Sequence, residues 1–209
     1  MNEFLDWGEP IQKHRHHLPH WQQGDAWIFV TWRLADSLPT ALLEKWQRER
    51  NKWIGFHPEP WDEETECIYQ ERFSDRIDEW LDAGSGACVL KQSNCAKVVS
   101  EALHHFEGHR YQLDCYVVMP THVHVLFRPL GAHKLDQIIH SWKRHTARVM
   151  NRILETNGTL WMADYWDRLI RSKNHFQRIR DDILTNPAKL PKGSYVVYGG
   201  RPARAQDAG

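Results

Sequence analysis

Cysteines are few in this sequence, and no motif clusters them. The four present among 209 residues, Cys67, Cys88, Cys95 and Cys115, match neither a CxxC metal clip nor a secreted disulfide scaffold. No apolar run approaches the length of a membrane span, and residues 1–10 lack the basic and apolar segments of a signal peptide. We therefore expect free thiols in a reducing compartment and a cytoplasmic protein with no membrane association.

Net charge is also absent, but the charges are unevenly distributed. Lysine plus arginine and aspartate plus glutamate both total 27, so the formal net charge is +0. Residues 59–82 hold ten acidic and two basic side chains, whereas residues 134–180 hold ten basic and four acidic ones. This asymmetry favours a polyanionic partner, with a salt-balanced soluble surface as the alternative.

Apolar periodicity predicts the order of the elements. We expect strands at 26–34, 111–119, 122–129 and 166–171, and helices from residue 40 and at about 61–80, 93–106, 135–153 and 174–186. With an inserted helical region at about 56–108 set aside, the order is β-α-β-β-α-β. This order predicts an α+β fold of the ferredoxin-like split βαβ type, with a central antiparallel sheet, inserted helices and a C-terminal helix.

The expected domain division follows from the same pattern. The domain should span residues 25–190, between an N-terminal arm at 1–24 and a tail at 191–209. The arm carries the basic and histidine-rich run 13–17, which is read as solvated or as contacting phosphates.

A histidine pair follows an apolar strand. His122 and His124 are two residues apart, so on a strand both imidazoles point to one face. Two neutral imidazoles side by side are half of a metal site, although two ordinary buried histidines would show the same spacing.

The helix expected at 135–153 has two contrasting faces. One is apolar, and the other carries Arg144, Arg148 and Arg152. The arginines are either a solvated surface or a stripe that follows DNA phosphates.

Several short motifs occur in an order that resembles a known family. They are His17-Leu18-Pro19-His20-Trp21, Thr31-Trp32-Arg33-Leu34, Val117-Val118-Met119-Pro120-Thr121-His122-Val123-His124, Ser141-Trp142-Lys143, Tyr165-Trp166-Asp167-Arg168 and Asn186-Pro187. Over residues 14–190 the chain resembles the REP-associated tyrosine transposases, a branch of the HUH endonuclease superfamily of single-tyrosine transposases.

The resemblance implies a metal-dependent reaction on single-stranded or hairpin DNA. In this family the histidine pair, here His122 and His124, binds Mg²⁺ or Mn²⁺, and the asparagine corresponding to Asn186 completes the site. The cation stabilises charge on a scissile phosphate. A tyrosine four residues before the asparagine attacks phosphorus and forms a covalent 5′-phosphotyrosine. The expected protein is a monomer or homodimer. The expected DNA-binding residues are Arg15, His17, Arg33, Lys143, Arg144, Arg148, Arg152, Arg168 and Arg171.

The family's tyrosine is missing from this chain. Asp182 occupies the nucleophile position, four residues before Asn186. An acyl phosphate formed on aspartate would hydrolyse, so Asp182 is better suited as a hard oxygen ligand or as a base for water. Tyr165 is the expected substitute nucleophile, although a tyrosine in this segment more commonly packs in the core. Tyr195 and Tyr198 are further alternatives.

Three hypotheses remain open on the sequence. The first is a transposase-like HUH DNA endonuclease that carries out phosphodiester cleavage and strand transfer with a substitute nucleophile or water. The second is a descendant without a nucleophile that only binds hairpin or single-stranded DNA. The third, more remote, is a protein whose histidines hold Zn²⁺.

Overall fold

The centre of the computed structural model, which describes residues 2–15, 19–58, 61–82 and 84–200, is a five-stranded antiparallel sheet. Its strands lie in the order β6-β3-β5-β4-β7. Their bounds are β3 Ile28–Arg33, β4 Tyr111–Val118, β5 His122–Pro129, β6 Trp166–Leu169 and β7 Val196–Gly199. The first four strands have the order of a split βαβ unit, so the expected fold class is confirmed.

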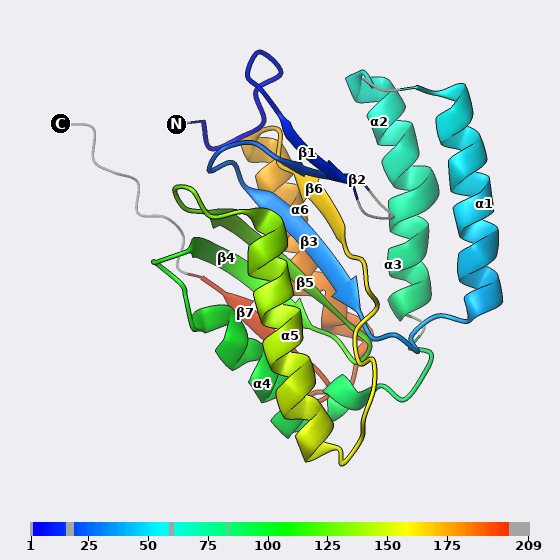
Figure 1. Ribbon diagram of the computed structural model, residues 1–209, viewed down its shortest axis with the longest axis vertical. Coiled ribbons are helices and arrows are strands. Elements are labelled where there is room, and N and C mark those ends of the chain that lie inside the picture. The colour runs from blue at the N-terminus through cyan, green and yellow to red at the C-terminus, as the bar shows by residue number, and fades with distance from the viewer. Residues whose placement is uncertain (1, 16–18, 59–60, 83, 201–209) are drawn as a thin grey trace.

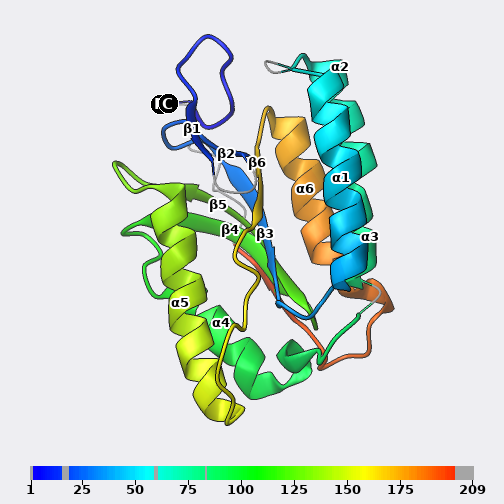
Figure 2. The same cartoon turned by 45° about the vertical axis from the view of Figure 1, so that its right-hand side comes forward.

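Helices cover both faces of the sheet (Figures 1 and 2). On one face lie α4 (Ser93–His104) and α5 (Leu135–Ile153), packed against each other and against the odd-numbered residues of β5, such as Val125. On the other lies α6 (Lys173–Thr185), whose Ile179 and Ile183 pack with Leu126 of β5. The alternation of β5 therefore directs His122 and His124 to the α6 face.

The helices between β3 and α4 form a unit with its own aromatic core. They are α1 (Thr40–Phe56), α2 (Glu63–Tyr69), a π-helical segment (Gln70–Ser74) and α3 (Asp75–Asp82). Their core contains Trp46, Trp53, Trp61 and Phe73. Because α4 packs with α5 on the sheet, we propose α1 to α3 as the inserted unit, in place of residues 56–108.

The helix expected at about 61–80 is observed over residues 63–82, and a π-helical segment lies within it. The Nε1 atom of Trp46 donates a hydrogen bond of 3.1 Å to the carbonyl of Phe73, which lies in this segment. The rings of Tyr69 and Phe73 both pack on Trp53, with centroids 5.6 and 5.7 Å from it. The wider turn brings both rings to the same neighbour.

Both ends of the described chain are more ordered than the sequence predicts. Residues expected in the arm form a hairpin of β1 (Gln12–Arg15) and β2 (Pro19–Gln22), and β2 packs against β6. Residues expected in the tail form β7, which pairs with β4. Residues 16–18 and 201–209, including His17, lie outside the described residues.

The structure also describes three of the cysteines and the apolar character of the helices. Cys88, Cys95 and Cys115 are free and buried. No helix in the described part of the chain is long and apolar enough to cross a membrane.

Candidate active site

The two histidines of β5 face each other at short range. Their Nε2 atoms lie 3.0 Å apart, and the ring planes are inclined at 74°. Both side chains are buried, with 0% and 2% of the surface of His122 and His124 exposed. Two cis ligands of an octahedral cation with bonds of ~2.1 Å are about 3.0 Å apart, so this spacing suits a shared cation.

Two threonines orient the imidazoles through the opposite ring nitrogens. The Thr121 hydroxyl donates to the carbonyl of Leu81 at 3.0 Å, so it accepts from Nδ1 of His122, also at 3.0 Å. This arrangement leaves the lone pair of His122 on Nε2. Thr31 Oγ1 lies 2.7 Å from Nδ1 of His124 and is the hydrogen-bond partner of that ring. Ligating histidines are commonly held in this way.

Burial keeps both imidazoles neutral. Burial, together with the neighbouring His124, lowers the pKa of His122 well below its usual value. Burial lowers the pKa of His124 to about 3. A neutral imidazole offers a lone pair to a metal, whereas an imidazolium does not.

The end of α6 supplies oxygen atoms at the same end of the sheet. In Figures 1 and 2 the C-terminal end of α6 and the start of β5 lie at this end. Asn186 caps the helix, and its Oδ1 atom is buried with no hydrogen-bond partner among the described residues. Asp182 is exposed one turn earlier, so the two residues share a helix face.

The donor set therefore fits a divalent cation. Two oriented imidazoles and a buried, unpartnered amide oxygen are present, and the imidazole spacing agrees with an octahedral ion. Among the described residues, no three His, Cys, Asp or Glu side chains could hold a metal by themselves. The amide of Asn186, which the resemblance implies as the third ligand, is of another type.

Arg33 lies directly beside the histidine pair. It is the register partner of His122 on β3, and it is 1% exposed. Its Nη1 atom donates to the Leu34 carbonyl and to Ser37 Oγ, while Nε has no partner in the described structure. Its guanidinium lies 5.9 Å from the ring of Trp166, which with Arg168 comes from the neighbouring strand β6.

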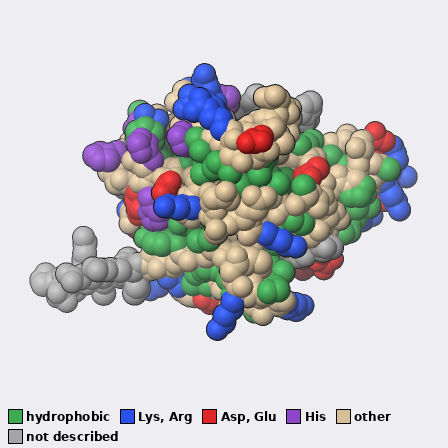
Figure 3. Space-filling model, turned by 90° about the horizontal axis from the view of Figure 1, so that it is seen from below, with side chains coloured by type: hydrophobic (Ala, Val, Ile, Leu, Met, Phe, Trp, Pro, Cys, Tyr) green, Lys and Arg blue, Asp and Glu red, His purple; other side chains and the backbone are tan. Residues whose placement is uncertain are grey.

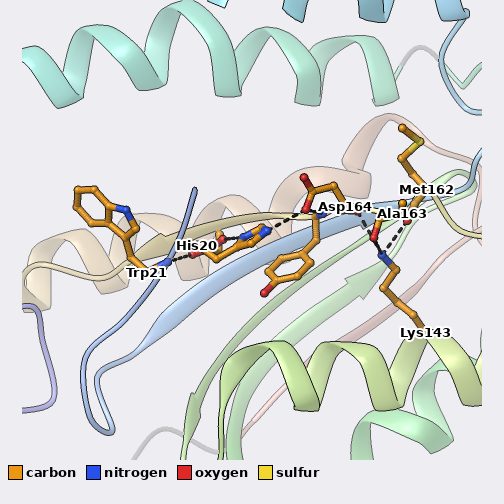
Figure 4. A network of polar contacts seen from close by, with 8 residues as sticks. His20, Trp21, Lys143, Met162, Ala163 and Asp164 are labelled. Atoms are coloured by element: carbon orange, nitrogen blue, oxygen red, sulfur yellow. Dashed lines mark hydrogen bonds and ion pairs between the residues drawn. The ribbon is translucent and has the colours of Figure 1, made fainter. Parts of the chain in front are cut away.

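A second polar cluster anchors the hairpin and β6 to the fold (Figure 4). His20 of β2 contacts Asp164, at 2.8 Å, and Asp167. Burial alone would lower the pKa of His20, but the two carboxylates outweigh it and raise that pKa to about 9. A charged imidazolium therefore holds the hairpin, which explains why these residues are not a free arm.

Lys143 has a structural partner that the sequence does not reveal. Its Nζ atom reaches from α5 to the carbonyls of Met162, Ala163 and Asp164, at 2.7, 2.7 and 3.3 Å (Figure 4). Burial lowers the pKa of its ammonium to about 8, although Asp164 opposes that shift. These bonds hold the segment that leads into β6.

The expected DNA-binding residues divide between two sides of the sheet. Arg33 and Arg168 lie on the side of the histidines, whereas Arg144, Arg148 and Arg152 are exposed on α5, across the sheet. Arg144 and Arg148 line a shallow hollow together with His140. Seen from below, histidines gather toward one side of the molecule, while Lys and Arg side chains are scattered (Figure 3).

Two further expected residues can be placed. Arg15 ends β1, and the backbone N–H of Arg171 donates to His175 Nδ1 at the start of α6. Arg15 therefore lies on the hairpin and Arg171 at the base of α6, away from the α5 stripe.

Tyr165 is packed in the core shared with α4 and α5, across the sheet from the histidines. Its ring stacks on His20 with centroids 3.9 Å apart, and burial raises the pKa of its phenol. Tyr198 lies on the same side, stacked on Tyr116 at 5.1 Å. The structure brings neither hydroxyl to the histidine pair.

The sequence analysis did not identify several residues of the site. Thr31 and Thr121 belong to the motifs of the resemblance, but the sequence did not indicate a role for either. Each of them adjoins a histidine across or along the strand. Arg50 is 4% exposed on α1, where it follows Trp46 by one turn. An arginine on the apolar stripe of a helix was the signal that could have revealed it.

One protein family is similar to the part of the chain that contains the histidine pair. Residues 88–181, which include α4, β4, β5, α5, β6 and most of α6, match the family described as "Transposase IS200 like". This stretch, a little under half of the chain, is therefore similar to the IS200-like transposases. The resemblance inferred from the motifs agrees with this match at the level of the IS200-like transposases.

Two solved structures are also similar to the chain. One is a REP-associated tyrosine transposase bound to a REP hairpin, with 14% identity, a TM-score of 0.43, and coverage of 84% of this chain and 74% of that one. The other is a transposase from Deinococcus radiodurans R1, with 15% identity, a TM-score of 0.34, and coverage of 82% and 95%. No curated protein matches the chain.

Proposed function

We propose that this protein is a metal-dependent HUH endonuclease of the transposase type that acts on single-stranded or hairpin DNA. The observation that carries the proposal is the pair of Nε2 atoms 3.0 Å apart, each ring oriented by a threonine. His122, His124 and Asn186 would hold Mg²⁺ or Mn²⁺, which when bound would neutralise charge on a phosphate.

The remaining residues act on the DNA itself. Arg33 lies beside His122 and stabilises negative charge on the strand at this point. Asp182 accepts a proton from water as the water oxygen bonds to phosphorus. The bond from phosphorus to the 3′-oxygen then breaks and that oxygen takes up a proton from solvent, which leaves a 5′-phosphate and a 3′-hydroxyl. This route replaces the phosphotyrosine step with hydrolysis.

A second candidate is a protein that binds the same DNA without cutting it. Aspartate at the family's nucleophile position favours this candidate, because binding depends mainly on contacts to phosphate and sugar. REP-type hairpins are the proposed partner in both cases.

A cleavage assay separates the two candidates. A labelled hairpin oligonucleotide with a single-stranded flank is incubated with the protein and Mn²⁺, and the products are resolved under denaturing conditions. The endonuclease should produce nicks that EDTA and His122→Ala abolish. Binding without nicks would support the second candidate, and absence of binding would contradict both.

A further inference from the structure

A small cavity next to the histidine pair contains two buried arginines. It has a volume of about 180 Å³ and lies between α1 and the segment leading into β6. Its lining includes Arg33 and Arg50, the apolar side chains Leu43, Trp46, Met162 and Trp166, and the polar Gln47, Asn51 and Asp164. Met162 and Asp164 appear in Figure 4, below the helices of the inserted unit.

Both arginines have donors that the described part of the protein leaves unused. Arg33 Nε and Arg50 Nη2 are buried without a hydrogen-bond partner. One other nitrogen of each guanidinium is held in place: Arg33 Nη1 donates to Leu34 O and Ser37 Oγ, and Arg50 Nε donates to the Tyr69 hydroxyl at 2.6 Å. Buried polar groups are nearly always paired, so two unpaired donors on side chains that line one cavity indicate an acceptor that the described protein itself does not supply.

The walls of the cavity indicate what kind of acceptor enters it. Arg50 lies 5.8 Å from the ring of Trp46, and that ring packs edge-on against Trp166 at 6.3 Å. The indoles offer a phosphate no replacement for its hydration, and the carboxyl group of Asp164, which also lines the cavity, disfavours a second anion there. A nucleobase offers flat apolar faces to the indoles and an edge of acceptors to the guanidinium groups.

We propose that this cavity binds one unstacked guanine of a single DNA strand. Guanine presents two acceptors, O6 and N7, on one edge, and this is the edge that arginine reads. About 180 Å³ is the space of roughly six water molecules at ~30 Å³ each, enough for one base and too little for a larger ligand.

The position of the cavity relates the guanine to the cleaved bond. Arg33 and His122 are register partners on adjacent strands, which lie about 4.8 Å apart. The base would therefore belong to a nucleotide near the phosphate that the histidine pair holds. This inference rests on the proposed function, because it requires a DNA strand at the site, and it adds the base that the strand presents there.

Fluorescence anisotropy with labelled oligonucleotides tests the proposal. Binding is measured in EDTA, which prevents cleavage, for an oligothymidine strand, for the same strand with a single guanine, and for the strand with 7-deazaguanine at that position. We expect the guanine strand to bind about tenfold more tightly than oligothymidine, and the 7-deaza strand to lose most of that gain.

Variants assign the preference to the cavity. Arg50→Gln and the more conservative Arg50→Lys should reduce the guanine preference, measured as the ratio of the affinities for the guanine strand and for oligothymidine. Arg48→Gln is the matched control, since Arg48 is exposed on the same helix and pairs only weakly with Glu44 at 3.9 Å. Thermal unfolding followed by circular dichroism shows that each variant is folded, and if Arg50→Gln is not, Arg50→Lys carries the test.

The outcomes separate the two proposals. If neither strand binds, the proposed function fails. If both strands bind equally, or if Arg50→Lys and Arg50→Gln retain the full preference, the guanine proposal is overturned while the DNA-binding function stands. Competition by dGMP but not by inorganic phosphate at equal ionic strength supports a base site. Equal competition by phosphate would show an anion site and overturn it.

Discussion

Thr121 determines which nitrogen of His122 carries the proton. Its hydroxyl hydrogen goes to the carbonyl of Leu81, at the end of α3, so its oxygen accepts from Nδ1 of His122. The inserted helical unit is thereby connected to the histidine pair through one hydroxyl group.

This relationship predicts the effect of removing the hydroxyl. Thr121→Val should lower the affinity for Mn²⁺ by about 10–100-fold, because outer-shell partners of ligating histidines have effects of this size. Isothermal titration calorimetry measures the affinity. Thr121→Ser keeps the hydroxyl and should retain most of the binding. Equal affinities for both variants would contradict the role assigned to Thr121.

The amide of Asn186 should complete the cation site. We predict that a crystal structure with Mn²⁺ shows His122 Nε2, His124 Nε2 and Asn186 Oδ1 on one ion, with bonds of ~2.0–2.6 Å. Asn186→Ala should weaken Mn²⁺ binding, while the exposed Thr185→Ala should not. Side chains of these three residues more than about 8 Å apart would contradict the prediction, since ligand bonds are far shorter.

Restoring the family's tyrosine should restore covalent capture of DNA. Asp182→Tyr places a phenol one helical turn before Asn186, on the same helix face. We expect a protein–DNA adduct that survives denaturing electrophoresis, which the unaltered protein should not form through Asp182. Adding His122→Ala should abolish the adduct. If the unaltered protein already forms one, peptide mapping would identify a different nucleophile.

The exposed arginines of α5 should contribute a salt-dependent part of DNA affinity. Removing Arg148 should reduce the slope of log K against log salt concentration by about one if it contacts a phosphate. Anisotropy titrations at several salt concentrations measure this slope, with Arg48→Ala of α1 as the control. An unchanged slope for Arg144→Ala, Arg148→Ala and Arg152→Ala would show that the stripe is only solvated.

Protonation of His20 should stabilise the fold below alkaline pH. Its pKa is about 9 in the folded protein, above the ordinary value of 6.5. A raised pKa adds stability that is complete below about pH 6.5 and disappears as the pH rises through 9. We expect a loss on the order of 2–3 kcal/mol over this window. Urea unfolding across this range measures it, and His20→Gln should remove most of the dependence.

Local patterns were enough to predict strands β3 to β6, the main helices and the shared face of the histidines. The spacing of His122 and His124 determines that face, because side chains alternate along a strand. The apolar stripe of α5 and the cap of α6 by Asn186 follow from helical periodicity in the same way. These features depend on residues a few positions apart.

Features that join distant segments were decided by the tertiary structure. The sequence does not show that His20 meets Asp164, that Lys143 holds residues 162–164, or that Arg33 and Arg50 share a cavity. It also placed the arginines of α5 without indicating that the sheet separates them from the histidines. Such relations depend on which buried charges and aromatic rings contact one another when the layers pack. These contacts join residues far apart in the sequence, so no local pattern determines them.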